Sequence, residues 1–228
     1  GKHRPEEVEF VKDIREDAKR RDFSVNCIYY SLAKNRFIDI YSGIYDLSKH
    51  KIKTIETPEY VFQNDGLRIL RMIRLACELN FKIDKPTYLT ACTMAYRVKD
   101  VSGARKYGEL KRIVNANKKY AESKKNANLR GIKLLNYLKL WTALYTPLGK
   151  LRPVLSKKSK DDKFIALLID IVNGVNPDCV EYFLNDMLGT KGFNLTEKQK
   201  NDAIYIVGGY FDALNRRSNK QYFYKYFE

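Results

Sequence analysis

The chain has 228 residues, of which 43 are Lys or Arg and 27 are Asp or Glu, so its formal net charge is +16. This length suits one large domain or two small ones, and the 44% hydrophobic content is typical of a folded protein. No run approaches the roughly 18–20 apolar residues of a membrane span, and no signal peptide opens the sequence. We therefore expect a cytoplasmic protein and exclude an integral membrane role.

The cysteines and histidines predict neither a zinc site nor a catalytic thiol. The sequence has four cysteines and two histidines: Cys27, Cys77, Cys92, Cys179, His3 and His50. No CxxC pair is present, and neither histidine is near a cysteine, so the spacing of metal ligands is missing. Reduced, buried thiols are the interpretation that we adopt.

The N-terminal part of the sequence predicts short strands. Alternating apolar residues at 8–11 and 23–29 have the period of a half-buried strand, with a charged connector at 13–19 between them. Further short runs of β type lie at 37–41 and 52–55. Ser42-Gly43 signals a turn.

From Pro58 onward the pattern is helical. Asn64-Asp65-Gly66 offers a helix cap before the apolar stripe of residues 67–76. Later helices are expected at 85–98, 104–119, 129–144, 163–173, 179–188 and 197–213. The fold class is therefore mostly α with a small, incomplete α/β portion at the N-terminus.

Positive charge is concentrated in the middle of the chain. Residues 101–130 hold nine Lys or Arg against two Glu, and residues 131–163 hold eight against two Asp. Such a surface attracts polyanions, and 17 Tyr and 11 Phe are available for base stacking. The segment with Lys157, Lys158 and Lys160 is an expected loop between helical subdomains. A solvated lysine-rich face is the alternative explanation.

Two segments carry candidate chemistry. In Arg20-Arg21-Asp22-Phe23-Ser24-Val25-Asn26, paired arginines offer planar donors suited to phosphate oxygens, and Asp22 can fix their rotamers. A surface ion-pair cluster is the alternative for this segment.

The second segment is Asp65-Gly66-Leu67-Arg68-Ile69-Leu70-Arg71-Met72-Ile73-Arg74. Asp65 and Arg68 are three residues apart, so at a helix start they share a face where an acceptor and a donor can read a base edge. Arg71 and Arg74 add positive charge for a triphosphate. The alternative is an amphipathic helix with solvated arginines.

Together these segments resemble successive motifs of class II tRNA nucleotidyltransferases, which add CCA to tRNA 3′ ends and are similar to bacterial poly(A) polymerases. The motif between them is Gly43-Ile44-Tyr45-Asp46-Leu47, and His3-Arg4-Pro5-Glu6-Glu7-Val8-Glu9-Phe10-Val11 resembles the strand before the first motif. The resemblance covers about residues 3–84. Beyond them it is architectural, an all-helical basic region. The resemblance implies that the chain consists of the C-terminal part of a head (1–57), a helical neck (58–120) and a helical body and tail (121–228).

The resemblance implies roles for individual residues. Arg21 would contact the incoming nucleotide, with Asp22 and Asn26 on its sugar and triphosphate. Asp65 and Arg68 would select C or A without a nucleic-acid template. The remaining implied residues are Gly43, Asp46 and Leu47 for the turn from head to neck, Arg71 and Arg74 for the base or phosphates, and Lys111, Arg112, Lys118, Lys119, Lys157 and Lys158 for the RNA backbone.

The sequence also departs from the family pattern. Asn64, Gly66 and Ser24 stand where the family usually has Glu, Pro and Thr, and Val61 stands at a common Arg position. No Asp-x-Asp pair precedes Arg20, although the family uses one to hold Mg²⁺. We therefore expect a C-terminal part of the enzyme, with the Mg²⁺ ligands upstream, no catalytic residue or metal ligand in this chain, and no activity of the chain alone.

The implied function is template-independent addition of CTP and ATP to a tRNA 3′ end. A poly(A) polymerase, or an enzyme that adds only CC or only A, has the same motifs and is the nearest alternative. A noncatalytic RNA-binding module of basic helices is the alternative from another class.

Overall fold

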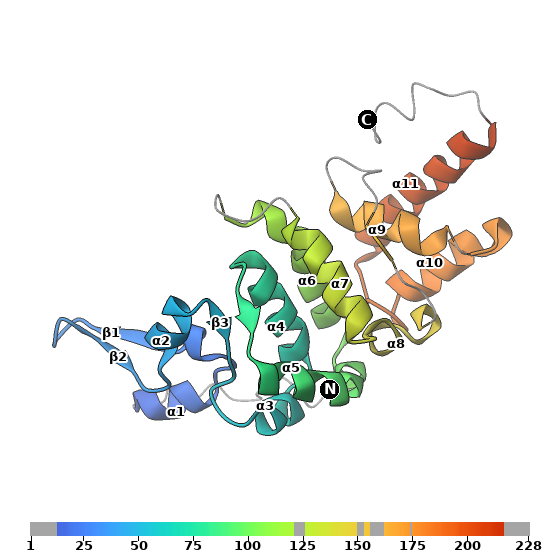
Figure 1. The fold of residues 1–228 in the computed structure, drawn as a ribbon. Helices are drawn as coiled ribbons and strands as arrows, with labels where there is room; N and C mark the ends of the chain where they lie inside the picture. Colours follow the sequence, from blue (N-terminus) through green and yellow to red (C-terminus); the bar gives the residue numbers. More distant parts are fainter. Residues whose placement is uncertain (1–12, 121–125, 150–152, 156–161, 174, 217–228) are drawn as a thin grey trace.

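The computed structural model describes residues 13–120, 126–149, 153–155, 162–173 and 175–216 (Figure 1). A small N-terminal part with short strands lies at one end, and helices make up the rest of the described chain. The expected fold class, mostly α with a small α/β portion at the N-terminus, is confirmed.

The N-terminal part is built around a hairpin. Strand β1 (Ile28–Ser31) pairs antiparallel with β2 (Arg36–Asp39), in a register that sets Tyr30 opposite Phe37. The other N-terminal elements are α1 (Ile14–Lys19), the 3-10 turn η1 (Ser24–Asn26), α2 (Gly43–Ser48) and β3 (Lys51–Ile52).

The segment predicted as a charged connector is the helix α1. Asp13 caps it, because its carboxylate accepts a hydrogen bond from the backbone N–H of Arg15 at 2.8 Å. Glu16 and Asp17 lie in the first turn and Lys19 in the last, which suits the helix dipole. The capping pattern was therefore readable in the sequence, but the high charge concealed it.

The run at 23–29 is also different from its prediction. Residues 24–26 form the turn η1, so only the end of the run is a strand. The alternation arises because Phe23 and Cys27 are buried on either side of that turn. Phe23 makes a single bridge with Thr54, so the expected strand at 52–55 is reduced to β3 and this bridge.

The middle motif is a helix rather than a turn from head to neck. Gly43, Asp46 and Leu47 all lie in α2, whose N-terminus is capped by the carboxylate of Asp39. Asp46 is buried and accepts a hydrogen bond from the Ser24 hydroxyl at 2.6 Å. This contact ties α2 to η1, and so joins the second motif to the first.

The helical part follows the predicted order with extra breaks. The α-helices are α3 (Pro58–Asn64), α4 (Leu67–Glu78), α5 (Lys85–Thr93), α6 (Gly103–Val114), α7 (Ala127–Tyr137), α8 (Trp141–Leu144), α9 (Lys163–Val172), α10 (Val180–Leu188) and α11 (Glu197–Arg216). The 3-10 turns are η2 (Ala95–Asp100), η3 (Ala116–Lys118), η4 (Thr146–Leu148) and η5 (Pro177–Cys179). The single helix expected at 129–144 is split at Lys139, whose φ of 53° is left-handed.

A short strand missed by the sequence analysis joins the two parts. Strand β4 (Lys82–Ile83) follows α4 and pairs in parallel with β3, with Ile52 opposite Ile83. Two residues carry too little periodicity to predict a strand. This pairing fixes α4 against the N-terminal part, which is what brings the two candidate segments together.

Helices α4, α6 and α7 form the centre of the fold and lie side by side in Figure 1. Gly131 of α7 lies so close to Ile113 of α6 that a Cβ would approach its methyl group to 2.4 Å. Arg130 donates to the carbonyl oxygens of Ala76 and Phe81, at 2.7 and 2.6 Å, and so closes the end of α4. Among the described helices, none combines the length and the apolar character that crossing a bilayer requires.

Candidate nucleotide-binding site

A pocket of about 420 Å³ lies between the N-terminal part and the start of α4. Its lining residues come from both candidate segments and from α6: Arg20, Arg21, Asp22, Asn26, Asp65, Arg68, Arg71 and Arg105. Six of the seven predicted nucleotide-binding residues therefore share one cavity. The volume of this cavity suits a small-molecule ligand.

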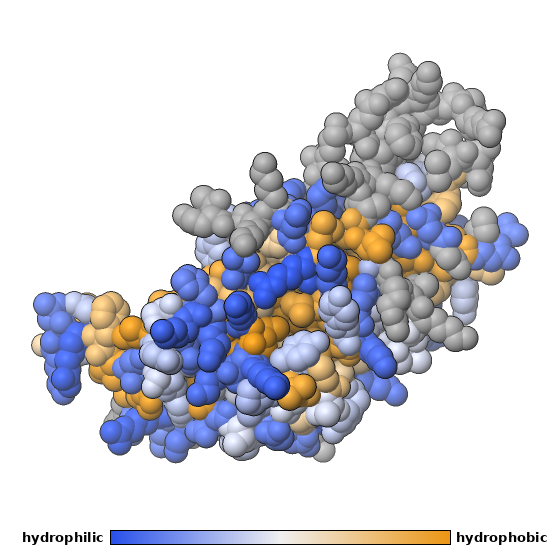
Figure 2. Space-filling view, in the orientation of Figure 1, coloured by the Kyte–Doolittle hydropathy of each residue, from blue (hydrophilic) through white to orange (hydrophobic). Residues whose placement is uncertain are grey.

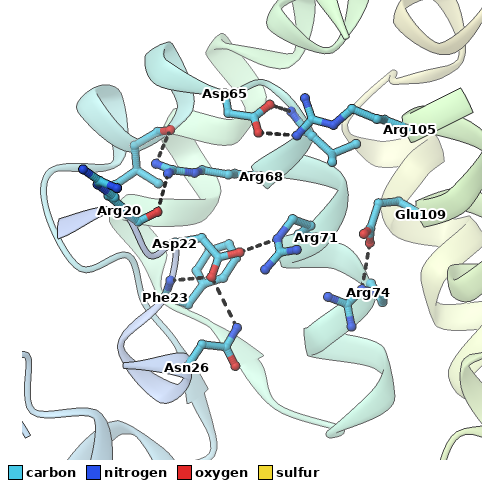
Figure 3. Close-up of polar contacts among 12 residues, drawn as sticks. Arg20, Asp22, Phe23, Asn26, Asp65, Arg68, Arg71, Arg74, Arg105 and Glu109 are labelled. Atoms are coloured by element: carbon cyan, nitrogen blue, oxygen red, sulfur yellow. Dashed lines mark hydrogen bonds and ion pairs between the residues drawn. The ribbon is translucent and has the colours of Figure 1, made fainter. Parts of the chain in front are cut away.

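Asp22 makes several of the polar contacts on the side of the pocket formed by the N-terminal part. Its side chain is 5% exposed, and Oδ1 accepts hydrogen bonds from the backbone N–H of Phe23 at 3.0 Å and from Asn26 Nδ2 at 3.3 Å (Figure 3). Its other oxygen, Oδ2, accepts from Nε of Arg71 at 2.5 Å. Asp22 therefore holds Arg71 in place across the junction between the first motif and α4, as a buried carboxylate must be paired.

Asp65 sits at the break between α3 and α4. Its Oδ1 accepts from the backbone N–H of Leu67 at 3.0 Å, which confirms the predicted cap at the start of α4. Its Oδ2 accepts from Nη2 of Arg105 at 2.6 Å, from helix α6. The base-reading candidate is thus fixed by two bonds, and it still has lone pairs for a further donor.

Arg68 spans the junction from the other side. Its Nη1 donates to the carbonyl oxygen of Val61 at 3.2 Å and its Nη2 to that of Arg20 at 2.8 Å (Figure 3). A guanidinium has five N–H donors, so donors remain for a ligand. Arg68 and Asp65 line the same pocket, which is the arrangement that their spacing predicted.

Gly66, between these two residues, has a steric role. A Cβ at this position would lie 2.2 Å from the carbonyl oxygen of Arg97 in η2. Any other residue would therefore push α4 away from η2. The glycine that departs from the family pattern is the residue that this close approach requires, and its neighbour Asn64 is exposed.

The structure contradicts the prediction for Arg74. Its side chain is 11% exposed and lies outside the pocket lining, with Nε bonded to Glu109 at 2.7 Å and Nη1 to Glu78 at 2.8 Å. Burial disfavours its charge, but the two carboxylates more than offset this, so the pKa of Arg74 is raised. The geometry of the helix explains the error. Three residues fall about 60° short of a full turn, so after two such steps Arg74 points about 120° away from Arg68.

Arg105 is the pocket residue that the sequence analysis missed. It lies 40 residues after Asp65 and belongs to the basic stretch that was assigned to RNA. Its i+4 neighbour Glu109 holds Arg74, so α6 supplies a charged partner to α4 at two places. The sequence signal for this role was weak: an arginine and a glutamate four residues apart, which lie on the same face of α6.

The pocket has the chemistry of an anion site. Five arginines face two aspartates in its lining, and a guanidinium binds phosphate oxygens in two-pronged fashion. Carboxylate and amide groups beside them supply acceptors and donors for a base edge or sugar hydroxyls. Among the described residues, no cluster of three or more His, Cys, Asp or Glu side chains could hold a metal ion, so these residues do not fit a Mg²⁺ site.

The predicted RNA-binding residues that the structure describes lie outside the pocket lining. Lys111 and Arg112 are exposed on α6, and Lys118 and Lys119 are exposed in and just after η3. Lys111 lies over the ring of Tyr107, with 5.7 Å from Nζ to the ring centre. Figure 2 shows hydrophilic residues running across the middle of the face toward the viewer. Lys157 and Lys158 are outside the described residues, and the role of the others stays a prediction.

Comparisons with known proteins find similarity over part of the chain. The profile of the poly(A) polymerase head domain family matches residues 1–53. The CCA-adding enzyme of Lactococcus lactis subsp. lactis is 34% identical over 111 residues, which are 49% of this chain and 28% of the relative. That of Staphylococcus haemolyticus is 34% identical over 142 residues, 62% of this chain and 34% of the relative. The aligned part of the chain is thus similar in sequence to the CCA-adding enzyme family.

Solved structures of the family have the same fold. The CCA-adding enzyme of Bacillus stearothermophilus in complex with CTP superimposes with a TM-score of 0.66 at 21% identity, over 90% of this chain and 49% of the other. That of Thermotoga maritima, complexed with tRNA, gives 0.66 at 21% identity, over 89% and 49%. The chain thus spans about half the length of these structures, and about a third or less of the two sequence relatives.

Proposed function

We propose that this chain is the nucleotide-selecting and RNA-binding part of an enzyme that adds CCA to tRNA 3′ ends from CTP and ATP. The observation that carries the proposal is the shared pocket, which joins Asp65 and Arg68 to the arginines of the first motif. Solved relatives form complexes with CTP, ATP and tRNA, which supports the same ligand classes here.

In this proposal the pocket residues divide by chemistry. Asp65 accepts from, and Arg68 donates to, the pairing edge of the incoming base, because a matched acceptor and donor distinguish bases by their exocyclic groups. Arg21 and Arg71 hold the triphosphate, and Asn26 with Asp22 faces the sugar. Arg105 orients Asp65 through their 2.6 Å contact. These residues bind and orient, and none of them transfers a proton.

The larger assignments belong to the same proposal. Residues 1–57 form part of the head, 58–120 the neck and 121–228 the body and tail. Lys111, Arg112, Lys118 and Lys119 contact the RNA backbone. The full-length protein is cytoplasmic, and it uses Mg²⁺, which would neutralise the triphosphate and activate the tRNA 3′ oxygen. The described residues include no cluster of three or more carboxylate, imidazole or thiol groups that could hold that ion.

Nucleotide binding to this chain tests the selection step. CTP, ATP, GTP and UTP are titrated separately by calorimetry. We expect CTP and ATP to bind at least about tenfold more tightly than GTP and UTP, the discrimination of one good two-pronged contact. Arg68→Ala should remove this preference while the affinity for tRNA is unchanged. Equal affinity for all four nucleotides in the native sequence would reject the proposal.

Arg112 provides a matched control for Arg68→Ala, because its side chain is 62% exposed and lies outside the pocket lining. Arg112→Ala should leave nucleotide preference unchanged and weaken tRNA binding. If Arg68→Ala and Arg112→Ala weaken tRNA binding and nucleotide selection equally, the pocket has no separate role in selection.

The second candidate is a poly(A) polymerase of the same family, which the head-domain match favours equally. Incubating the full-length protein with a tRNA that lacks its terminus, and with CTP alone, ATP alone or both, separates the candidates. A CCA-adding enzyme extends with CTP first and stops after one A, whereas a poly(A) polymerase makes long products from ATP alone. Addition of only CC or only A identifies a partial enzyme, and RNA binding without extension identifies a noncatalytic module.

A further inference from the structure

Arg21 is the pocket arginine whose orientation is set by residues outside the pocket. Its Nε and Nη2 donate to the same oxygen, Oδ2 of Asp17, at 3.1 and 2.8 Å. Asp17 is one helical turn earlier, in α1, and does not line the pocket. A single carboxylate oxygen thus fixes one side of the guanidinium.

Tyr29 completes the arrangement from strand β1. Its hydroxyl donates to the same Asp17 oxygen at 2.8 Å, and its ring lies 5.8 Å from the guanidinium carbon of Arg21. The bonds from Arg21 and Tyr29 lower the pKa of Asp17, while burial and the bond to Asp17 raise the pKa of Tyr29. Asp17 is therefore ionised and Tyr29 neutral at physiological pH.

The donors that remain on Arg21 point to its use. With Nε and one N–H of Nη2 engaged, the guanidinium keeps Nη1 and the second N–H of Nη2, which together form an intact two-donor edge. Such an edge matches two oxygens of a phosphate group. An arginine held on one edge also loses less side-chain freedom when a ligand binds the other, which favours binding.

We propose that Asp17 and Tyr29 are positioning residues that hold Arg21 with its free edge toward a phosphate group in the pocket. This inference rests on the proposed function and deepens it, because it assigns the phosphate-binding part of the site. Neither residue touches the ligand. Both act through Arg21, Asp17 as the acceptor for its side edge and Tyr29 as the donor that fixes Asp17.

Because Asp17 is negatively charged, the direction in which its removal changes phosphate affinity distinguishes two possible roles. A nearby carboxylate repels phosphate, so if Asp17 only lowered the positive potential, its removal would strengthen phosphate binding. If it orients Arg21, removal weakens binding, because the arginine must then be ordered by the ligand. The two roles therefore predict opposite shifts in affinity.

The experiment measures the affinity of the chain for CTP and for inorganic tripolyphosphate by calorimetry. Arg21→Ala should weaken both about tenfold, the equivalent of about 1.4 kcal/mol. Asp17→Asn should weaken both about fivefold, and Tyr29→Phe about twofold, as expected for a partly exposed ion pair and its support. Glu16→Gln removes the same charge from the neighbouring exposed residue and should not weaken binding.

A double variant separates positioning from other effects. Asp17→Asn in the Arg21→Ala background should cause no further loss, because Asp17 acts only through Arg21. Circular dichroism and urea unfolding confirm that each variant is folded, and Tyr29→Phe, which removes one hydroxyl, tests the arrangement if Asp17→Asn is unstable.

The outcomes are distinct. Tighter or unchanged tripolyphosphate binding by Asp17→Asn and Tyr29→Phe overturns the positioning role, as does an equal loss with and without Arg21. Tripolyphosphate binding that follows the expected pattern without any preference among the four nucleotides rejects the proposed function but keeps the positioning role. No tripolyphosphate or CTP binding by the native sequence overturns both.

Discussion

Helices α4 and α6 are joined by ion pairs in two regions, and these regions behave differently. At the pocket end, Asp65 before α4 meets Arg105 of α6, with side chains 23% and 36% exposed. At the buried end, the charges are exchanged: Arg74 of α4 meets Glu109 of α6, with side chains 11% and 7% exposed (Figure 3). Glu78, 3% exposed, gives Arg74 a second carboxylate.

The difference lies in solvation. The pocket pair is partly exposed to solvent, so its bond can be exchanged for a bond to a ligand at less cost than a buried one. The buried cluster has no such freedom, since an unpaired charge there would lack both water and a partner. Paired arginines and carboxylates therefore line the pocket at one end of α4 and fix the helix packing at the other. Four experiments sharpen this comparison.

Removing one arginine from each region should give the largest contrast. Arg74→Ala removes the guanidinium that the buried carboxylates of Glu78 and Glu109 share, so we expect the free energy of unfolding to fall by about 3–5 kcal/mol. Arg105→Ala should cost at most about 1 kcal/mol. Urea unfolding followed by circular dichroism measures both, and similar losses for the two variants would show that the regions are not different.

The close approach of the start of α4 to η2 should depend on Gly66. Gly66→Ala sets a Cβ 2.2 Å from the Arg97 carbonyl oxygen, and the displacement of α4 should cost about 1–3 kcal/mol and weaken CTP binding. Gly108 is the control, because a Cβ there meets nothing within 4 Å, and Gly108→Ala should stabilise α6 slightly. Thermal unfolding and CTP titration report the two effects, and a neutral Gly66→Ala would contradict the close approach.

Lys106, next to Arg105 on α6, tests a buried charge without a carboxylate. Its Nζ donates to the carbonyl oxygens of Lys99 and Ala143 at 3.1 and 3.0 Å, and burial lowers the pKa of Lys106. Because the unfolded chain then holds this proton more tightly, the contribution of Lys106 to the free energy of unfolding should rise with pH between the folded pKa and 10.5. The difference in urea-unfolding free energy between the native sequence and Lys106→Met over this range isolates this contribution, and a difference that does not change with pH would contradict it.

Thiol labelling is the mildest test, since it leaves the sequence unchanged. Cys92 and Cys179 are exposed, which corrects the expectation that all the cysteines are buried. Burial raises the pKa of Cys77 in α4 to about 12, and it also raises that of Cys27. A thiol reagent should therefore modify Cys92 and Cys179 rapidly and the other two only in urea. Rapid labelling of Cys77 would show that the buried region of α4 opens readily.

Much of the site followed from local patterns. The Asn-Asp-Gly run predicted the cap at Asp65, because an aspartate next to a helix start bonds the first free backbone N–H groups. The spacing of Asp65 and Arg68 predicted a shared face. Likewise, the long apolar periodicities predicted most helices, whereas α1 was missed because its signal was a cap and charges rather than an apolar stripe.

What the sequence determined by itself was the order of motifs and the helical class, since apolar periodicity and caps depend on neighbours within one or two helical turns, and the family resemblance indicated most of the pocket residues. The tertiary structure alone decided which arginines face the pocket. Arg74 became buried and Arg105 joined Asp65 because α4 packs against α6, a segment about 40 residues away. Burial and pairing of a charge depend on the partner brought near it in space, and spacing along one helix carries no information about that partner.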